Sequence, residues 1–350
     1  MEVDFLLVGQ GVAGTLLSYR LIEGGKRVHV IDQPQKNTCS RVAAGLFNPV
    51  TGRNLVKTWN ADIIFPEIVP LYTRLEKELK VKFLHKRRIY RPFTSLTEQN
   101  DWMGRSSDEA FKPYINGIKS VSDFPEVHDP MGGLYVGQAG YVDMPVLLDR
   151  YARWLEERGQ YSGEAFEEKE LVFTESAVRY REIHARSLVF VNGMEATKSR
   201  FFTWLPLIPN KGEILVVKQS FLPSEIINRG VFRISLSDNT VRVGSTYNVR
   251  DLEPMPTEVG KKEILYRLEK LVHPPVEEVL EHAWGIRPTV SDRRPVLGKH
   301  PEVPDVYIFN GLGTKGVSLA PYYSKMMFNY LIFGNEPPEE VNLRRFFKYI

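Results

Sequence analysis

The N-terminal part of the chain has the pattern of a strand–turn–helix–strand unit. Val3–Val8 is a short apolar run typical of a buried strand, and Arg27–Ile31 is a second such run. Between them, a turn with the sequence Gly-Gln-Gly-Val-Ala-Gly at 9–14 leads into a helical segment, Val12–Glu23. A βαβ unit with this glycine spacing opens a parallel sheet that is covered by helices. We therefore predict an α/β protein with a Rossmann-like domain.

Each glycine of the turn has a physical role in binding a dinucleotide. Gly9 permits the tight turn, Gly11 lets the backbone approach a pyrophosphate, and Gly14 lets the helix pack against the strand. The helix N-terminus favours the anion. Asp32, at the end of the second strand, can accept hydrogen bonds from ribose hydroxyls and would repel the 2′-phosphate of NADP. The unit predicts dinucleotide binding, but it does not separate FAD from NAD.

The order of the remaining elements predicts a nucleotide domain made of discontinuous segments. A strand-rich middle follows the first unit, and the chain closes with a strand at Val306–Phe309, a glycine-rich turn and a helix at Val317–Phe333. A helix at Pro66–Leu79, a helix at Met144–Glu157 capped by Asp143 and alternating strands over Leu171–Asn192 are also expected. The expected nucleotide domain comprises 1–62, 141–212 and 284–350, and the inserted β-rich (α+β) substrate-binding domain comprises 63–140 and 213–283.

Composition narrows the class of protein. The net charge of +3 is nearly balanced, so it does not call for a nucleic acid partner. A single cysteine, Cys39, excludes an intramolecular disulfide and a multi-cysteine metal site, and it fits a reducing compartment. The start of the chain lacks the pattern of a signal peptide, and no apolar run has the length of a transmembrane helix. We expect a cytoplasmic protein without a metal or membrane insertion; the oligomeric state is left open.

Four further stretches follow the glycine turn in a characteristic order: Ser40–Phe47, Leu205–Val217, Trp284–Pro288 with Asp292 and Pro295, and Asn310–Pro321. With them, the chain resembles the FAD-dependent amine and amino-acid oxidases of the D-amino-acid oxidase superfamily, which includes glycine oxidase and sarcosine oxidase. The resemblance implies FAD as the cofactor, so the nucleotide domain at 1–62, 141–212 and 284–350 is the expected FAD-binding domain. Sarcosine oxidases attach the flavin to a cysteine in the last stretch, and residues 310–321 contain none. Non-covalent FAD is therefore expected.

The resemblance also implies roles for individual residues. Arg287 matches the arginine that grips the substrate carboxylate, Thr314 lies near the substrate where glycine oxidase has a larger polar residue, and Tyr247 is a candidate to point its hydroxyl into the pocket. These three are the expected catalytic residues. Lys211 or Lys315 is a candidate to assist reoxidation by its positive charge. The expected cofactor-binding residues are Gly9, Gly11, Val12, Ala13, Gly14, Asp32, Gln33, Ser40, Arg41, Ala44, Gly45, Leu46, Phe166, Gly193, Gly285, Gly313, Thr314, Lys315, Gly316 and Val317.

The implied reaction is oxidation of the C–N bond of an amino acid or secondary amine by hydride transfer to flavin N5, followed by hydrolysis of the imine. Three alternatives stay open. The first is a tRNA-directed amine oxidase related to the wobble-uridine modification enzyme, for which a basic stretch could bind phosphates. The second is a flavoprotein without turnover, and the third is a nicotinamide-dependent dehydrogenase. The basic stretch comprises Lys80, Lys82, Lys86, Arg87, Arg88 and Arg91, with Phe83 and Tyr90 interleaved.

Overall fold

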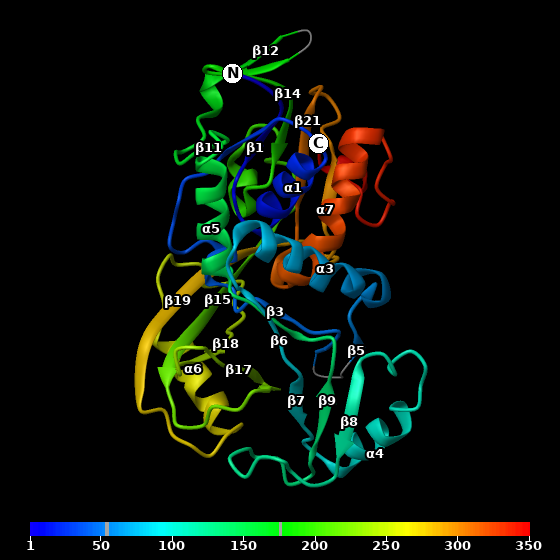
Figure 1. The fold of residues 1–350 in the computed structure, drawn as a ribbon, viewed down its shortest axis with the longest axis vertical. Coiled ribbons are helices and arrows are strands. Elements are labelled where there is room, and N and C mark those ends of the chain that lie inside the picture. The colour runs from blue at the N-terminus through cyan, green and yellow to red at the C-terminus, as the bar shows by residue number, and fades with distance from the viewer. Residues whose placement is uncertain (53–55, 175–176) are drawn as a thin grey trace.

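The computed structural model describes residues 1–52, 56–174 and 177–350. The molecule is elongated, with one large sheet in each half (Figure 1). Both chain termini lie in the half that contains β1 and α7, and the other half contains β7, β9 and α6. This mixed α/β arrangement confirms the predicted fold class.

The first large sheet is built around β1 (Glu2–Val8), which lies between β2 (Val28–Ile31) and β14 (Ile183–Phe190) and is parallel to both. The predicted N-terminal unit is confirmed, with helix α1 at Val12–Glu23 between the first two strands. The late strand β21 (Val306–Asn310) adds to β14, also in parallel. The remaining strands of this sheet are β11 (Tyr161–Ser162), β12 (Leu171–Phe173), β13 (Val178–Tyr180) and β20 (Val296–Lys299). Of the expected strand segment Leu171–Asn192, positions 175 and 176 lie outside the described residues.

Helices cover the first sheet and join it to the rest of the molecule. Helix α7 (Gly316–Phe333) packs against α1 and α3 (Ala61–Leu79). Helix α3 begins at Ala61, five residues before the predicted start at Pro66. Both Pro66 and Pro70 thus lie inside the helix. Helix α5 (Met144–Glu156) has the predicted cap, since the Asp143 carboxylate accepts a hydrogen bond from the Val146 N–H.

The second large sheet has the order β19-β15-β18-β17-β16-β7-β9-β8. Its two longest strands, β15 (Ile208–Lys218) and β19 (Glu278–Thr289), pair in antiparallel register along their length. The expected domain boundaries at 212/213 and 283/284 therefore fall inside two continuous strands. The other strands are β7 (Ile89–Pro92), β8 (Ile115–Lys119), β9 (Gly133–Val136), β16 (Ile226–Arg229), β17 (Val231–Ser235) and β18 (Val241–Gly244).

Smaller elements connect the two halves. A three-stranded sheet of β3 (Leu46–Phe47), β10 (Gly140–Val142) and β6 (Leu84–Lys86) lies where they meet (Figure 1). The pair β4 (Val50–Thr51) and β5 (Val56–Lys57) follows β3. The remaining helices are α2 (Cys39–Val42), α4 (Leu96–Arg105) and α6 (Glu258–Glu269), with 3-10 helices η1 (Glu168–Glu170), η2 (Gly193–Lys198), η3 (Gly313–Lys315) and η4 (Leu343–Tyr349).

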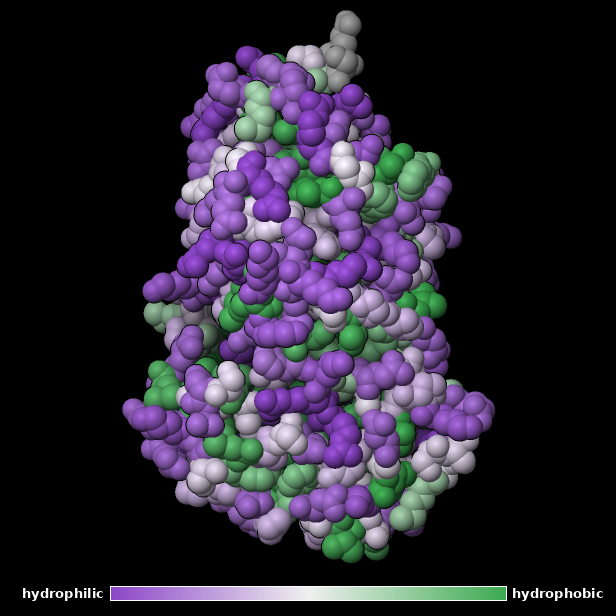
Figure 2. All heavy atoms as spheres, in the orientation of Figure 1, coloured by the Kyte–Doolittle hydropathy of each residue, from purple (hydrophilic) through white to green (hydrophobic). Residues whose placement is uncertain are grey.

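Hydrophobic side chains on the face shown in Figure 2 are interspersed with hydrophilic ones and form no broad patch. Among the described helices, none combines the length and apolar character needed to cross a lipid bilayer.

Candidate active site

Close packing explains the three glycines of the N-terminal turn. Gly9 has a φ of 109°, and a Cβ there would lie 2.8 Å from the Cα of Asn192. A Cβ on Gly14 would lie 2.1 Å from the Gly9 carbonyl oxygen, and a Cβ on Gly11 would lie 2.9 Å from Oγ of Ser40. Larger residues at these positions would push the helix off the strand and close the approach to its N-terminus.

Polar groups converge on the start of α1. The Ser40 hydroxyl accepts a hydrogen bond from the Val12 N–H at 3.0 Å, which brings the Ser40–Phe47 loop to the helix N-terminus. The Asp32 carboxylate accepts a hydrogen bond from the Gln10 N–H at 2.9 Å. Burial raises the pKa of Asp32, while the Gln10 N–H and the charge of Arg41 act in the opposite direction. A carboxylate held here can accept hydrogen bonds from a diol.

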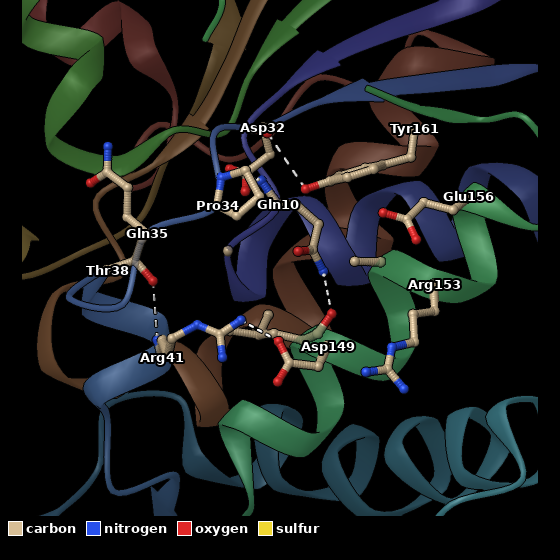
Figure 3. A pocket seen from close by; sticks show the side chains of 13 residues that line it. Gln10, Asp32, Pro34, Gln35, Thr38, Arg41, Asp149, Arg153, Glu156 and Tyr161 are labelled. Atoms are coloured by element: carbon tan, nitrogen blue, oxygen red, sulfur yellow. Dashed lines mark hydrogen bonds and ion pairs between the residues drawn. The ribbon is translucent and has the colours of Figure 1, made fainter. Parts of the chain in front are cut away.

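A pocket of about 360 Å³ opens beside this turn (Figure 3). Three of the expected cofactor residues line it, Gly11, Asp32 and Arg41, whereas Gln33 is exposed and does not. Arg41 points across the pocket and forms an ion pair with Asp149 of α5. The other lining residues are Gln10, Pro34, Gln35, Thr38, Leu148, Ala152, Arg153, Glu156 and Tyr161.

Sequence reasoning missed the contribution of α5 and β11 to this pocket. Tyr161 donates a hydrogen bond to the Asp32 carbonyl at 3.5 Å, so its ring lies beside the expected ribose site. The sequence did contain one signal for this wall of the pocket: the amphipathic helix that precedes Tyr161. Such a helix covers a sheet with its apolar face, and the strand that follows it, β11, pairs with β2.

A second helix N-terminus lies next to that of α1. A Cβ on Gly316 would lie 3.1 Å from Cγ1 of Val12, so the start of α7 packs against the start of α1. The Val317 carbonyl accepts a hydrogen bond from the Tyr72 hydroxyl at 3.0 Å. Gly313, with a φ of 54°, places η3 against Thr289 of β19. Two positive helix ends and a glycine-lined approach suit a cofactor with a pyrophosphate and an anionic ring system.

Arg287 projects from β19 toward this region. Its Nη1 donates to Oδ1 of Asn210 and to the Thr246 carbonyl, each at 3.3 Å, and its Nη2 donates to Oγ of Ser245 at 3.0 Å. These acceptors are neutral, and no ion pair joins Arg287 to a carboxylate within the described ranges. Burial lowers the pKa of Arg287, which remains a cation at neutral pH.

The structure brings the other expected catalytic residues near Arg287. Tyr247 follows the Ser245–Thr246 segment, its side chain is exposed, and its phenol lies close enough to influence the pKa of Arg287. Thr314 is exposed in η3, which packs against β19. Cys39 of α2 also lies close, since a Cβ on Gly285 would be 3.2 Å from its Cα. Burial raises the pKa of the Cys39 thiol, and the charge of Arg287 lowers it.

The remaining expected cofactor residues lie in different parts of the structure. Ala44, Gly45 and Leu46 run from α2 into β3, at the junction of the two halves. Phe166 is placed elsewhere: it stacks on Tyr180, with ring centroids 4.8 Å apart, in a hydrophobic cluster of the first large sheet, and it does not line the pocket. The Gly193 carbonyl accepts a hydrogen bond from Asn310, while Ala13 is buried in α1.

The two candidate lysines have different surroundings. Lys211 is buried, and its Nζ lies 3.6 Å from Oε1 of Glu213. Lys315 lies at the start of α7, where its Nζ donates to the hydroxyls of Thr51 and Thr58, each at 3.2 Å. Lys315 is thus beside the expected flavin site, whereas Lys211 belongs to an internal ion pair.

The paired helix ends, the glycine-lined approach and the partly buried arginine are features of a dinucleotide-dependent oxidoreductase. Residues 4–329 match the family described as DAO, FAD dependent oxidoreductase. The match covers most of the chain, so the protein belongs to this family. FAD is its cofactor, as predicted, and the nicotinamide alternative is set aside.

Two curated relatives are about a quarter identical to the chain over the aligned residues. The tRNA 5-methylaminomethyl-2-thiouridine biosynthesis bifunctional protein MnmC of Legionella pneumophila (strain Corby) is 24% identical over 87% of this chain and 47% of that protein. The chain thus spans about half the length of these bifunctional relatives. Glycine oxidase of Bacillus licheniformis is 23% identical, over 95% of this chain and 93% of that enzyme.

Solved structures share the fold. Iminodiacetate oxidase from Chelativorans sp. BNC1 has a TM-score of 0.78 at 20% identity, covering 98% of both chains. Glycine oxidase from Geobacillus kaustophilus has a TM-score of 0.75 at 19% identity, covering 96% of both chains.

Proposed function

We propose that the protein oxidises the C–N bond of an amino acid or of a secondary amine that carries a carboxylate, with Arg287 as the carboxylate anchor. One observation carries this proposal: a partly buried guanidinium is held only by neutral acceptors. Removing a cation from water without an anionic partner is unfavourable, so a bound carboxylate would offset a cost already present in the free enzyme.

The residues around Arg287 fix its orientation. Asn210 and Ser245 accept hydrogen bonds from the two terminal nitrogens, and the Thr246 carbonyl shares one of them. A guanidinium fixed in this way can present a planar fork to a carboxylate and so determine the direction in which the amine points. The bound FAD supplies the hydride acceptor. Positioning by Arg287, Tyr247 and Thr314 is the contribution proposed for the protein.

FAD binding is proposed to involve Asp32 at the ribose and the adjoining starts of α1 and α7 at the pyrophosphate and ring. We propose that the attachment is non-covalent. Cys39, the single cysteine, lies beside Gly285, where a thiol with a raised pKa is a poor nucleophile.

A tRNA-directed amine oxidase is the second candidate, because the relatives that share most of the chain include the bifunctional tRNA-modifying protein. The basic stretch gives this candidate little support. Lys82 pairs with Glu76, Arg88 pairs with Glu225, and Arg91 is buried and donates to the Gly52 carbonyl. A steep decrease of RNA affinity with salt would favour it over the small-substrate function.

Anaerobic reduction of the flavin with glycine, sarcosine, D-amino acids and larger secondary amines tests the proposal. At least one carboxylate-bearing amine should bleach the absorbance near 450 nm. Arg287→Ala should weaken binding of that substrate by about 2–5 kcal/mol, as when a desolvated charge pair loses a partner. Arg186→Ala is the control, because the Arg186 side chain is exposed. If no amine bleaches the bound flavin, the protein is a flavoprotein without this turnover; an unchanged KM in Arg287→Ala would remove the anchor role.

A further inference from the structure

Arg242 projects from the same face of the second large sheet as Arg287. Asn210 of β15 lies opposite Arg287 of β19, and Val216 of β15 lies opposite Arg242 of β18. Directly opposite residues share a face, and so do alternate residues of one strand. Asn210 and Val216 are six positions apart, so both arginines are on one face. The other face is covered by α6, where a Cβ on Gly260 would meet the Glu213 carboxylate.

Arg242 has polar atoms with no partner. Its Nε and Nη1 are buried and form no hydrogen bond with any residue that the structure describes. The nearest acidic group on its own hairpin, Asp238, uses Oδ1 to accept two hydrogen bonds from Thr240. No ion pair in the described chain includes Arg242, and its charge acts on Asp238 only from a distance, where it helps to lower the pKa of that carboxyl. Two buried donors of Arg242 therefore remain without an acceptor.

The surroundings of Arg242 connect it to the loop expected beside the flavin. Tyr141 of β10 lies opposite Leu46 of β3, and its ring stacks on His85 of β6 at 4.5 Å. The guanidinium of Arg87 lies 5.6 Å from the same ring. These strands belong to the small sheet between the two halves (Figure 1).

Several charged groups act on the Tyr141 phenol. Burial raises the pKa of the Tyr141 phenol, whereas the charges of Arg87 and Arg242 lower it. Asp143 and Asp238 raise it again, but Asp143 is engaged as the cap of α5. The Arg87 guanidinium thus lies beside Tyr141, and the charge of Arg242 acts on the same phenol.

The separation of the two arginines suits one small ligand. The Arg287 head group lies 3.0 Å from Oγ of Ser245, and Arg242 is three residues from Ser245 along the chain. Three residues span at most about 10 Å, so one extended small ligand with two separated anionic groups has the size needed to reach from one arginine to the other.

We propose that Arg242 forms a second anion-binding subsite, which selects amines bearing a second carboxylate at the end remote from the one held by Arg287. This subsite rests on the proposed function, since Arg287 supplies the first anchor. Arg242 acts here as a specificity-determining residue; Arg87 and Tyr141 form the wall beside it.

Ligand binding to the oxidised holoenzyme tests the subsite without turnover. Succinate, glutarate and adipate are titrated against the monocarboxylates of equal chain length, with the shift of the flavin spectrum and the melting temperature as readouts. We expect the best dicarboxylate to bind at least tenfold tighter than its monocarboxylate. Arg242→Met should abolish this difference and leave the monocarboxylate affinity unchanged, and Arg242→Lys should retain part of it. Arg250→Met, which removes an exposed positive charge nearby, should retain it in full.

The outcomes separate the two proposals. If monocarboxylates bind and depend on Arg287, but dicarboxylates bind no tighter or Arg242→Met weakens both alike, the subsite is wrong and the proposed function stands. If O-phosphorylated monocarboxylates gain affinity through Arg242 while dicarboxylates do not, the carboxylate assignment is overturned. If no carboxylate binds the wild-type holoenzyme, the Arg287 anchor fails, and the subsite fails with it.

Discussion

The guanidinium of Arg287 occupies the space that a side chain on Gly212 would fill. A Cβ at Gly212 would lie 1.8 Å from Nη2 of Arg287 and 2.1 Å from its Cζ. Gly212 faces Gly285 across the two strands, so the arginine reaches along the sheet over a pair of glycines to Ser245 and Thr246. The absence of a side chain at Gly212 therefore sets the position of the proposed carboxylate anchor.

Gly212→Ala should displace Arg287 and weaken binding of carboxylate ligands about tenfold or more, because a misplaced head group loses its aligned hydrogen bonds. Titration of the holoenzyme with the best carboxylate ligand measures this loss. Gly104→Ala is the matched control, since a Cβ there meets no atom within 4 Å. Equal affinities for both variants and the wild type would show that Gly212 does not position Arg287.

Asp32→Asn should have opposite effects on the apoprotein and on FAD binding. Burial raises the folded-state pKa of Asp32 above its ordinary value, so the ionised carboxylate destabilises the apoprotein at neutral pH. That cost disappears as pH falls through the raised pKa toward the ordinary one. The variant should therefore unfold at higher denaturant than wild type at pH 7, with the advantage shrinking toward pH 4. Its FAD affinity should fall, because the carboxylate is the proposed ribose ligand.

Asp4→Asn provides the contrast for this experiment. Burial alone would raise the pKa of Asp4, but hydrogen bonds and charge from Arg27 lower it overall. The stabilising contribution of Asp4 is thus present above its ordinary pKa and lost as pH falls through the lowered one. Asp4→Asn should lower stability at pH 7 without changing FAD affinity. A destabilised Asp32→Asn apoprotein would contradict the burial argument.

Glu213→Ala should destabilise the protein strongly. The Glu213 side chain is 5% exposed and accepts hydrogen bonds from the Thr257 N–H, the Thr257 hydroxyl and His282. Its loss would also leave the buried Lys211 with only the more exposed Asp251 carboxylate, 3.8 Å from its Nζ. Breaking a buried pair costs about 3–5 kcal/mol of unfolding free energy. The exposed Lys218–Glu278 pair in the same two strands is the control, and Glu278→Ala should cost less than about 1 kcal/mol. Urea denaturation measures both, and similar values would contradict the prediction.

The sequence predicted those parts of the site that depend on local backbone geometry. The Gly9–Gly14 turn and the cap at Asp143 follow from rules that apply within a few residues. The pocket wall on α5 and β11 could not be predicted in the same way, because Tyr161 reaches Asp32 only through the pairing of β11 with β2. Phe166 shows the same limit: it lies close to Tyr161 in sequence but packs with Tyr180 instead. The position of Arg242 likewise depends on the register of β15 with β18.

Composition does not distinguish Lys211 from Lys315. The alternation of side chains along a strand does predict which face of the sheet Lys211 occupies. Lys211 precedes Gly212 on β15, so it points to the face opposite Arg287, where Glu213 and Asp251 lie within 4 Å of its Nζ. Lys315 is held by two neutral threonine hydroxyls. Burial lowers the pKa of Lys315, and the charge of Arg293 lowers it further. Its positive charge is therefore less compensated than that of Lys211.

Lys315→Met should slow reoxidation of the reduced enzyme by oxygen by roughly tenfold or more, because a preorganised charge near developing negative charge is lost. Anaerobic reduction by substrate should change little, since Lys315 does not contact Arg287. Stopped-flow measurement of the two half-reactions separates these effects. Thr51→Val combined with Thr58→Val is the companion variant: it keeps the charge but removes both acceptors, and it should slow reoxidation less than Lys315→Met. Lys211→Met should not slow reoxidation selectively, because that cation is paired on the far face of the sheet. If Lys211→Met slowed reoxidation and Lys315→Met did not, the assignment of the two lysines would be reversed.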